Sequence, residues 1–313
     1  MAESLSFEEL FIQPKEYSSK TELKILLISD IRSRFLNLIK LKELLNQKQM
    51  FFDAVFVLGN FLDGEGNYRE EVKAESVIAS YLNIIESINT HVFFIPSSTD
   101  PQSLFRTKPE SLPSLSVLSE NIHNNFFKLA EDLFLIGFGR SSSEEKEEKM
   151  DGGEKDNVNN LKCTTNNRLL GQHSTTKNFP NLKAETKHSK ELASLFRRYK
   201  DFLNRNYIKK DIIKFILLSD IDLGDSNDGD QNLIQKSDKN NCDSVFLRDL
   251  LVNDNTSCFL TIHSSNSSPA SVTTVNEIKV INPGNCSEGK FTSLTIAREN
   301  CEWKIKECKT IEI

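Results

Sequence analysis

Short apolar runs recur along the chain, and each of them delivers a polar residue at its end. The runs are Lys24-Ile-Leu-Leu-Ile-Ser-Asp30, Phe52-Asp-Ala-Val-Phe-Val-Leu-Gly-Asn60, His91-Val-Phe-Phe-Ile-Pro-Ser-Ser-Thr-Asp100, Phe215-Ile-Leu-Leu-Ser-Asp220 and Phe259-Leu-Thr-Ile-His263. Short apolar runs between polar or turn-forming segments are typical of buried strands. Because open α/β sheets bind ligands at the carboxyl ends of their strands, these polar residues form the candidate site.

Longer segments with helical periodicity separate these strands. We expect helices near residues 34–47, 70–88, 184–206 and 244–252, and further strands at 133–137, 212–218 and 257–261. Alternation of strands and helices predicts a layered α/β fold with parallel strands. Residues 270–281 and 290–297 alternate apolar and polar side chains, which predicts an antiparallel hairpin. The segment that joins them, Asn282-Pro-Gly-Asn-Cys-Ser-Glu-Gly289, is rich in turn-forming residues.

Polar segments divide the rest of the chain. Residues 1–20 are predicted to be a polar N-terminal arm, and residues 21–313 a single domain. Insertions at 141–183 and 222–241 are rich in charged residues, Asn, Ser and Gly. We expect both insertions to be disordered, because they can bury too little apolar surface to offset the entropy of ordering them.

The composition argues against several classes of protein. The formal net charge of −6, with no basic cluster, argues against nucleic-acid binding. No apolar run reaches the length of a membrane-spanning helix, and the acidic first residues do not resemble a signal or transit peptide. The six cysteines have no zinc-ligand spacing, which is typical of free thiols in a reducing compartment. We therefore expect a cytoplasmic or nuclear protein that binds neither nucleic acid nor a membrane.

In their order and spacing, the strand ends resemble the motif blocks of the calcineurin-like metallophosphoesterases. The matching segments are Ser29-Asp-Ile-Arg32, Gly59-Asn-Phe-Leu-Asp63, Ser97-Ser-Thr-Asp100, Ser219-Asp220, Ile262-His-Ser-Ser265 and Ile281-Asn-Pro-Gly284. Pro96-Ser-Ser-Thr-Asp-Pro101 and Gly137-Phe-Gly-Arg140 look most similar to the small phosphodiesterase-like branch. The resemblance covers nearly the whole chain outside the insertions. It implies an αββα-type layered fold, with mixed sheets flanked by helices.

The resemblance also implies a two-metal site, and most of the implied ligands are replaced in this chain. Active members of the family hold divalent cations such as Mn, Fe, Zn or Mg, which activate a water and clamp the phosphoryl oxygens. Asp30 and His263 are retained at their positions. The replacements are Arg32, Asp220 and Ser265 at His positions, Asn60 at the position of the bridging Asp, Ser98 at an Asn position and Thr99 at the position of the catalytic His.

These replacements change the chemistry of the implied site. A guanidinium cannot ligate a metal, and a neutral amide cannot compensate two dications. Arg32 is therefore interpreted as an internal replacement for the cations, between Asp30 and Asp220. Taken alone, Asp30 and Arg32 also fit an ion pair at a strand end. His263 likewise fits a strand-end histidine that binds no metal.

Three functions remain open at this stage. The first is a catalytically degenerate pseudo-phosphoesterase, a binding or scaffold protein with a protein partner and no cofactor. The second is an active metal-dependent phosphomonoesterase or phosphodiesterase whose metal is held by Asp30, Asp220 and His263, with Asp63 or Asp100 moved inward. The third is a silent subunit of a larger complex, similar to the B subunits of replicative DNA polymerases, although the additional β domain of those subunits is not visible in the sequence.

Overall fold

The computed structural model describes residues 20–63, 71–88, 91–106, 113, 115–140, 186–206, 213–221, 239–253, 257–264, 271–275 and 277–313. The expected polar arm lies outside these residues, apart from Lys20. The first expected insertion lies outside them altogether. The second lies outside them up to residue 238, and residues 239–241 form the start of a helix.

The first of two sheets has six strands in the order β12-β11-β1-β2-β3-β4. These strands are β1 (Glu22–Ser29), β2 (Ala54–Leu58), β3 (Val92–Ile95), β4 (Ser119–Asn121), β11 (Lys290–Glu299) and β12 (Glu302–Glu312). Strands β1 to β4 are parallel, whereas β11 is antiparallel to both β1 and β12. The register pairs Ser29 with Leu58, so the residues that follow β1 and β2 leave the sheet at the same edge.

The second sheet also has six strands, in the order β5-β6-β7-β8-β10-β9. They are β5 (Asn125–Ala130), β6 (Leu133–Phe138), β7 (Lys214–Ser219), β8 (Cys258–His263), β9 (Ser271–Val275) and β10 (Ile278–Asn282). The four central strands are parallel, and the edge strands β5 and β9 are antiparallel to their neighbours. Ser219 pairs with His263, so β7 and β8 also end side by side.

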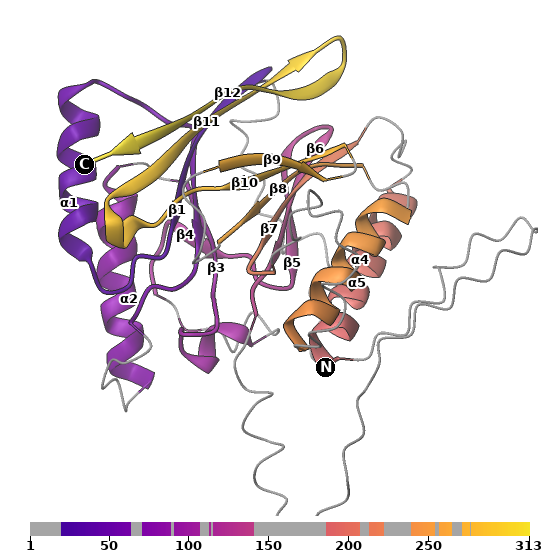
Figure 1. The fold of residues 1–313 in the computed structure, drawn as a ribbon, viewed down its shortest axis with the longest axis horizontal. Coiled ribbons are helices and arrows are strands. Elements are labelled where there is room, and N and C mark those ends of the chain that lie inside the picture. Colours follow the sequence, from indigo (N-terminus) through magenta and orange to yellow (C-terminus); the bar gives the residue numbers. More distant parts are fainter. Residues whose placement is uncertain are drawn as a thin grey trace, which may run out of the picture.

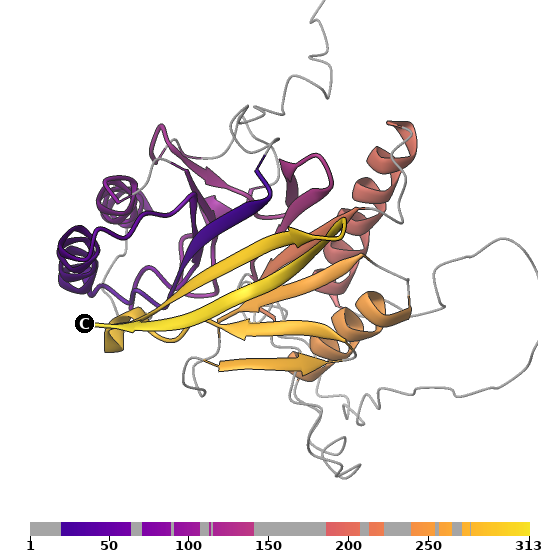
Figure 2. The ribbon, with the colours of Figure 1, turned by 90° about the horizontal axis from the view of Figure 1, so that it is seen from above.

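Helices cover the outer faces of the two sheets. Figures 1 and 2 show α1 (Phe35–Gln47) and α2 (Glu71–Glu86) on the first sheet and α4 (Lys187–Arg205) and α5 (Lys239–Asn253) on the second. Apolar side chains from both sheets, among them Leu27, Phe56, Leu135 and Leu218, are buried together in the central layer. This arrangement confirms the layered α/β fold expected from the sequence. No helix in the described part of the chain is long and apolar enough to cross a membrane.

The amphipathic pattern of α4 explains why this segment folds against the second sheet. Leu192, Leu195, Phe196, Tyr199 and Leu203 are buried at helical spacing on one face. Thr186 caps the helix, because its side chain accepts a hydrogen bond from the backbone N–H of Ser189. Asp243 of α5 accepts hydrogen bonds from the hydroxyls of Thr186 and Ser189, which fixes the start of α4 against α5.

The prediction that residues 270–281 and 290–297 form a hairpin with each other is wrong. Residues 271–282 form a hairpin by themselves, β9 with β10, in the second sheet. β11 belongs to the first sheet, where it pairs with β1 and with β12. The turn-forming segment therefore crosses between sheets, and it is held in place because Thr292 Oγ1 donates to the carbonyl of Pro283 at 2.9 Å. Between its turn residues lies the short 3-10 helix η4 (Cys286–Glu288).

Strand β12 was not predicted from the sequence, because most of its side chains are exposed. Only Trp303 and Ile311 of this strand are buried, so little apolar alternation marks it. The turn before it, at Asn300 and Cys301, has φ angles of 51° and 65°. Two consecutive left-handed residues are typical of the tight turns that match the twist of a β-hairpin. The short edge strands β4 and β5 were also not predicted.

Candidate functional site

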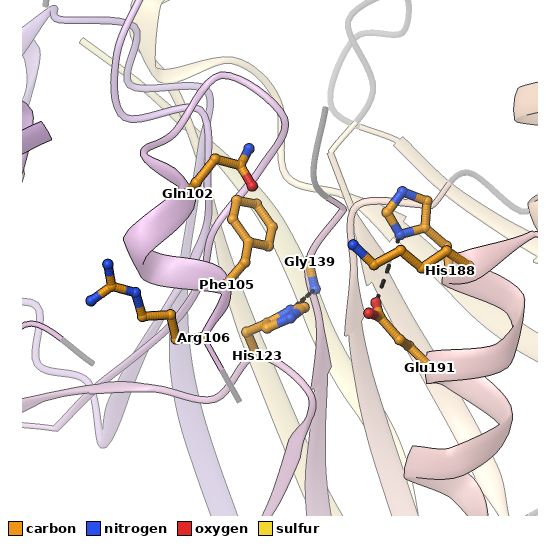
Figure 3. Close-up of a pocket in the computed structure, with 8 residues that line it drawn as sticks. Gln102, Phe105, Arg106, His123, Gly139, His188 and Glu191 are labelled. Carbon is orange, nitrogen blue, oxygen red and sulfur yellow. Dashed lines mark hydrogen bonds and ion pairs between the residues drawn. The ribbon is translucent and has the colours of Figure 1, made fainter. Parts of the chain in front are cut away.

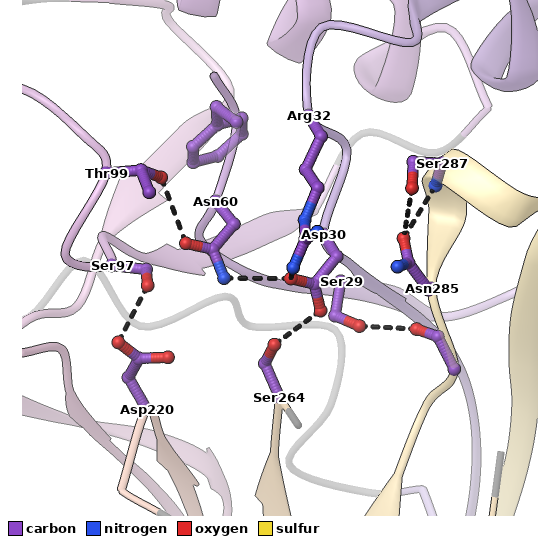
Figure 4. Close-up of polar contacts among 12 residues, drawn as sticks. Ser29, Asp30, Arg32, Asn60, Ser97, Thr99, Asp220, Ser264, Asn285 and Ser287 are labelled. Atoms are coloured by element: carbon purple, nitrogen blue, oxygen red, sulfur yellow. Dashed lines mark hydrogen bonds and ion pairs between the residues drawn. The ribbon is translucent and has the colours of Figure 1, made fainter. Parts of the chain in front are cut away.

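The candidate site lies where strands of both sheets end. Figure 4 shows Asp30 after β1, Asn60 after β2, Ser97 after β3 and Asp220 after β7, with their side chains pointing toward one another. The chain leaves β1 and β2 through left-handed backbone, with φ of 53° at Asp30 and 50° at Asn60. Asp and Asn tolerate this conformation better than other side chains, which explains their place in these tight exits.

Asp30 is the centre of a hydrogen-bond network to which three other residues donate. The residue is 1% exposed. Oδ1 accepts from Asn60 Nδ2 at 2.9 Å and from Arg32 Nη2 at 3.2 Å. Oδ2 accepts from Ser264 Oγ at 2.5 Å. Both oxygens of the one retained carboxylate at this position are thus occupied by amide, guanidinium and hydroxyl groups.

The orientation of the Asn60 amide is fixed from both sides. Thr99 Oγ1 donates to Asn60 Oδ1 at 3.0 Å, so the amide oxygen faces Thr99 and the NH₂ group faces Asp30. The backbone N–H of Arg32 also donates to the carbonyl of Asn60 at 2.8 Å, which ties the two strand exits together. Asn60 therefore presents a donor, and not a ligand oxygen, to the centre of the site.

The loop after β3 connects the two sheets through Ser97. Its hydroxyl donates to Asp220 Oδ2 at 2.7 Å, and its backbone N–H donates to Asp100 Oδ2 at 2.9 Å. The other oxygen of Asp100 accepts from the backbone N–H of Phe61 at 2.9 Å. Asp100 is therefore a buried organiser of the loops, because backbone donors occupy both of its oxygens.

The same loop approaches two glycines closely. A Cβ on Gly59 would lie 2.4 Å from Ser97 Cβ, and a Cβ on Gly139 would lie 2.0 Å from the carbonyl oxygen of Pro96. Only glycine leaves room for these contacts. Gly59 follows β2 of the first sheet and Gly139 follows β6 of the second, so the two glycines let the loop close the gap between these strands.

Burial changes the protonation of the two carboxylates around Ser97. It raises the pKa of Asp100 to about 7, although hydrogen bonds from Ser97 and Phe61 oppose the change. It also raises the pKa of Asp220 to about 7, with the neighbouring charges of Asp100 and Asp30 adding to the rise. The hydrogen bond from Ser97 and the charge of Arg140 lower the pKa of Asp220 in part.

Arg32 meets one of its two expected partners. It forms the expected ion pair with Asp30, and its side chain remains 34% exposed. The cation whose charge acts on Asp220 is Arg140, which follows β6. The positive charge at the site is thus divided between two arginines from different sheets.

The remaining sequence candidates lie at different depths around this network. His263, the last residue of β8, is buried, and the next residue, Ser264, contacts Asp30. Ser98 and Thr99 are exposed at the loop surface, and Asp63 is exposed after β2. Ser265 lies outside the described residues. Sequence reasoning missed Ser264, although its place directly after a strand-end histidine is a signal that could have found it.

The groups gathered here do not fit two divalent cations. A metal needs lone pairs, and the Asn60 NH₂ group and the Arg32 guanidinium offer only hydrogens toward Asp30. The carboxylate oxygens of Asp30 that could ligate already accept three hydrogen bonds from protein groups. Within the part of the chain that the structure describes, no group of three or more His, Cys, Asp or Glu residues is arranged to hold a metal ion.

Comparison with solved structures relates the fold to known proteins. The protein TT1561 of Thermus thermophilus superposes with a TM-score of 0.54 at 13% identity, over 92% of this chain and 99% of that chain. A dimetal phosphatase from Danio rerio has a TM-score of 0.49 at 11% identity, over 93% of this chain and 98% of its own. Calcineurin-like phosphoesterase YfkN from Bacillus subtilis gives a TM-score of 0.45 at 10% identity, over 93% and 90% of the two chains.

At these identities, structural likeness shows the fold alone. The superposition on the Thermus protein, together with the two mixed sheets and their flanking helices, gives this chain a layered α/β fold. No family model matches the sequence, and no curated protein does. What the chain does must therefore be argued from its own residues.

Proposed function

We propose that the chain is a pseudo-phosphoesterase, a protein that keeps the phosphoesterase-like fold and serves as a binding or scaffold protein instead of a metal-dependent hydrolase. The observation that carries this proposal is the set of three hydrogen bonds that Asp30 accepts from Asn60, Arg32 and Ser264. A cation that binds to Asp30 would have to compete with these hydrogen bonds. That exchange is unfavourable unless the metal is held by several further ligands.

The charge of the site supports the same proposal. Two dications need a bridging carboxylate and other anionic ligands nearby. Asn60 is neutral, Arg32 is positive, and Asp100 accepts hydrogen bonds from two backbone N–H groups. The positive charge that cations would supply next to Asp30 comes from a guanidinium that belongs to the chain itself.

A metal-dependent phosphoesterase with an atypical site is the second candidate. It is favoured by one observation, the raised pKa of Asp220, because titratable groups of this kind gather at active sites. In that case Asp30, Asp220 and His263 would hold one metal after the hydrogen bonds of Asp30 break. Such a metal would supply the activation of a water for the hydrolysis of a phosphate ester.

Hydrolysis of p-nitrophenyl phosphate and bis-p-nitrophenyl phosphate with added Mn²⁺ or Zn²⁺ separates the two candidates. We expect the wild type to show no more activity than its Asp30→Ala and His263→Ala variants under every metal condition. Activity that depends on Mn²⁺ and disappears in both variants would support the hydrolase. The exposed Asp63→Ala serves as a matched control, because it removes a carboxylate near the site without breaking the network around Asp30.

A binding or scaffold role also implies a protein partner. We propose that the full-length protein forms a complex in its cells of origin, whether as a scaffold or as a silent subunit. Size-exclusion chromatography of the endogenous protein should place it well above 35.7 kDa together with a second protein in constant ratio. Elution at the monomer mass at every dilution would count against this role.

A further inference from the structure

A second polar pocket lies beside the candidate site, between η1 (Gln102–Phe105), the turn before β5 and the start of α4. It has a volume of about 150 Å³ and is lined by Gln102, Phe105, Arg106, His123, Gly139, Lys187, His188 and Glu191. Figure 3 shows the η1 residues on one side, Glu191 and His188 of α4 on the other, and His123 with Gly139 between them. None of these residues belongs to the network around Asp30.

His123 presents a hydrogen-bond donor for which no acceptor is found among the described residues. Its Nδ1 accepts a hydrogen bond from the backbone N–H of Gly139 at 3.0 Å. In the neutral ring, the proton must then lie on Nε2. The side chain is 9% exposed, and within the described residues no hydrogen bond of Nε2 is found. Burial lowers the pKa of His123 to about 4, so the ring stays neutral and keeps this tautomer at neutral pH.

The ring of His123 is also held in a fixed orientation. Phe105 meets it edge to face, with ring centroids 5.1 Å apart at an interplanar angle of 78°. Phe138 lies on its other side at 5.7 Å. A buried donor that is fixed by two rings and one backbone hydrogen bond costs stability unless an acceptor reaches it. Water or a ligand in the pocket has to supply that acceptor.

The charges around the pocket favour an anionic acceptor. Arg106 and Lys187 are cations, and among the described residues of the lining Glu191 is the only carboxylate. Glu191 is turned toward His188, with Oε2 3.9 Å from Nδ1, and the neighbouring His188 lowers the pKa of Glu191. Lys187 and His188 are in the first turn of α4, where the helix dipole also favours negative charge. The guanidinium of Arg106 points away from His123 in Figure 3, so Lys187 is the cation that matters most.

We propose that this pocket binds a phosphate group, through the Nε2–H of His123 and the ammonium of Lys187, with the amide of Gln102 at its rim. Phosphate oxygens accept hydrogen bonds from neutral donors and are attracted by the ammonium, which matches this set. Among the described residues, the lining offers donors from three elements and one carboxylate, Glu191, which faces His188.

The pocket is adjacent to the strand-end site but does not depend on it. Gly139 contacts Pro96, which precedes Ser97, and Arg140 acts on Asp220. A phosphate group in the pocket would therefore be separated from the loop that joins the two sheets only by Gly139, which contacts Pro96 of that loop. The inference holds whether or not the strand-end site binds a metal, because none of the proposed contacts involves Asp30, Asp220 or His263.

Nuclear magnetic resonance of the histidine rings tests this inference directly. The chain has only five histidines, so protein labelled with ¹⁵N-histidine gives a simple spectrum, and His123→Asn identifies the signal of His123. With EDTA present, inorganic phosphate is added against sodium chloride of equal ionic strength. We expect the signal of His123 to show the Nε2–H tautomer and to move with phosphate along a saturating curve.

Charge variants show whether the binding uses this pocket. Lys187→Ala should weaken phosphate binding about tenfold, the usual loss for a charge-assisted contact. Glu191→Gln should tighten it, because it removes a carboxylate from the lining. Lys190→Ala is the matched control, since Lys190 is an exposed lysine of α4 that does not line the pocket, and it should leave the midpoint unchanged. A shift of His123 that never saturates, no shift at all, or equal midpoints for Lys187→Ala and Lys190→Ala would overturn the proposal.

Discussion

Asn60 Nδ2 donates a hydrogen bond of 2.9 Å to Asp30 Oδ1, across the ends of the neighbouring strands β1 and β2. The sequence resemblance implies two carboxylates at these positions, bridged by cations. In this chain a carboxylate and an amide stand there, and they are joined by a hydrogen bond. Asn60 and Asp30 are both buried, at 7% and 1% exposure, so their hydrogen bond is shielded from water. This contact, more than the ion pair with Arg32, accounts for the stability of the strand-end network.

Asn60→Asp tests whether the amide is essential to this arrangement. Two carboxylates at hydrogen-bond distance repel each other, so the variant should be less stable by about 2–4 kcal/mol at neutral pH. Acidification should restore part of the loss, because one proton shared by the pair removes the repulsion. Denaturant unfolding at different pH values would measure both effects, with Asn83→Asp on the exposed face of α2 as the control.

The same variant should also respond to metal. A second carboxylate beside Asp30 makes a site with more affinity for a divalent cation, and a ligand that binds the folded state raises its stability. We expect added Mn²⁺ to raise the melting temperature of Asn60→Asp and to leave that of the wild type unchanged. An equal rise in both proteins would show that Mn²⁺ binds elsewhere.

Arg32→Ala should lower the free energy of unfolding by less than the position of Arg32 beside Asp30 suggests. Its side chain is 34% exposed, so solvent screens the ion pair, and Asn60 and Ser264 still donate to the carboxylate after its removal. The expected loss is about 1 kcal/mol, against roughly twice that for Ser264→Ala, which leaves a buried carboxylate oxygen without its donor. Unfolding free energies with Arg34→Ala as the control give the comparison. A larger loss for Arg32→Ala than for Ser264→Ala would contradict this ranking.

The stability of the protein should fall as the pH rises from about 4 to 7. Asp100 and Asp220 have folded-state pKa values of about 7, above the ordinary value of 3.8. Between these values the folded protein keeps protons that the unfolded chain has lost, so stability is present at low pH and decreases as the pH rises through 7. The midpoint of urea unfolding as a function of pH measures this decrease. Asp220→Asn should make the decrease smaller, whereas the exposed Asp63→Asn should not change it.

Asp132 links the two sheets on the far side of the core, and its removal should destabilise the whole fold. It follows β5 in the second sheet and accepts a hydrogen bond at 2.9 Å from the indole nitrogen of Trp303 in β12 of the first. Arg298 of β11 forms an ion pair with it, also at 2.9 Å. Asp132→Ala should cost about 2–4 kcal/mol, because it leaves buried donors without an acceptor. Asp132→Asn keeps an acceptor for Trp303 and should cost less.

The sequence predicted the layered fold and its main elements because their signals are local. The apolar runs before Asp30, Asn60 and Asp220 became β1, β2 and β7, and the periodic segment at 184–206 became α4. Strands in the middle of layered sheets are buried on both faces, which makes them continuous apolar runs that stand out in a sequence. β12 could not be found in this way, since only its long-range pairing with β11 and a few buried side chains define it.

The location of the candidate site at the strand ends could be predicted from the sequence, but the contacts among its residues could not. The strand ends predicted that Asp30, Asn60 and Asp220 belong to one candidate site, since open α/β sheets bind ligands at the carboxyl ends of their strands. The role of Ser264 was not visible, because its hydrogen bond to Asp30 spans 234 residues. The crossing of residues 282–289 from one sheet to the other was also not visible, since turn chemistry alone does not say which strands a turn connects. Which residues far apart in the sequence contact each other is decided only when the whole chain packs.

The metal content of the purified protein tests the central claim most directly. The full-length wild type is incubated with Mn²⁺, Zn²⁺ or Fe²⁺, freed of unbound metal by gel filtration and analysed by mass spectrometry for metal per chain. The three hydrogen bonds that Asp30 accepts from Asn60, Arg32 and Ser264 predict far less than one equivalent, with no difference between the wild type and Asp30→Ala. One or more equivalents of metal in the wild type, lost in Asp30→Ala, would contradict the account.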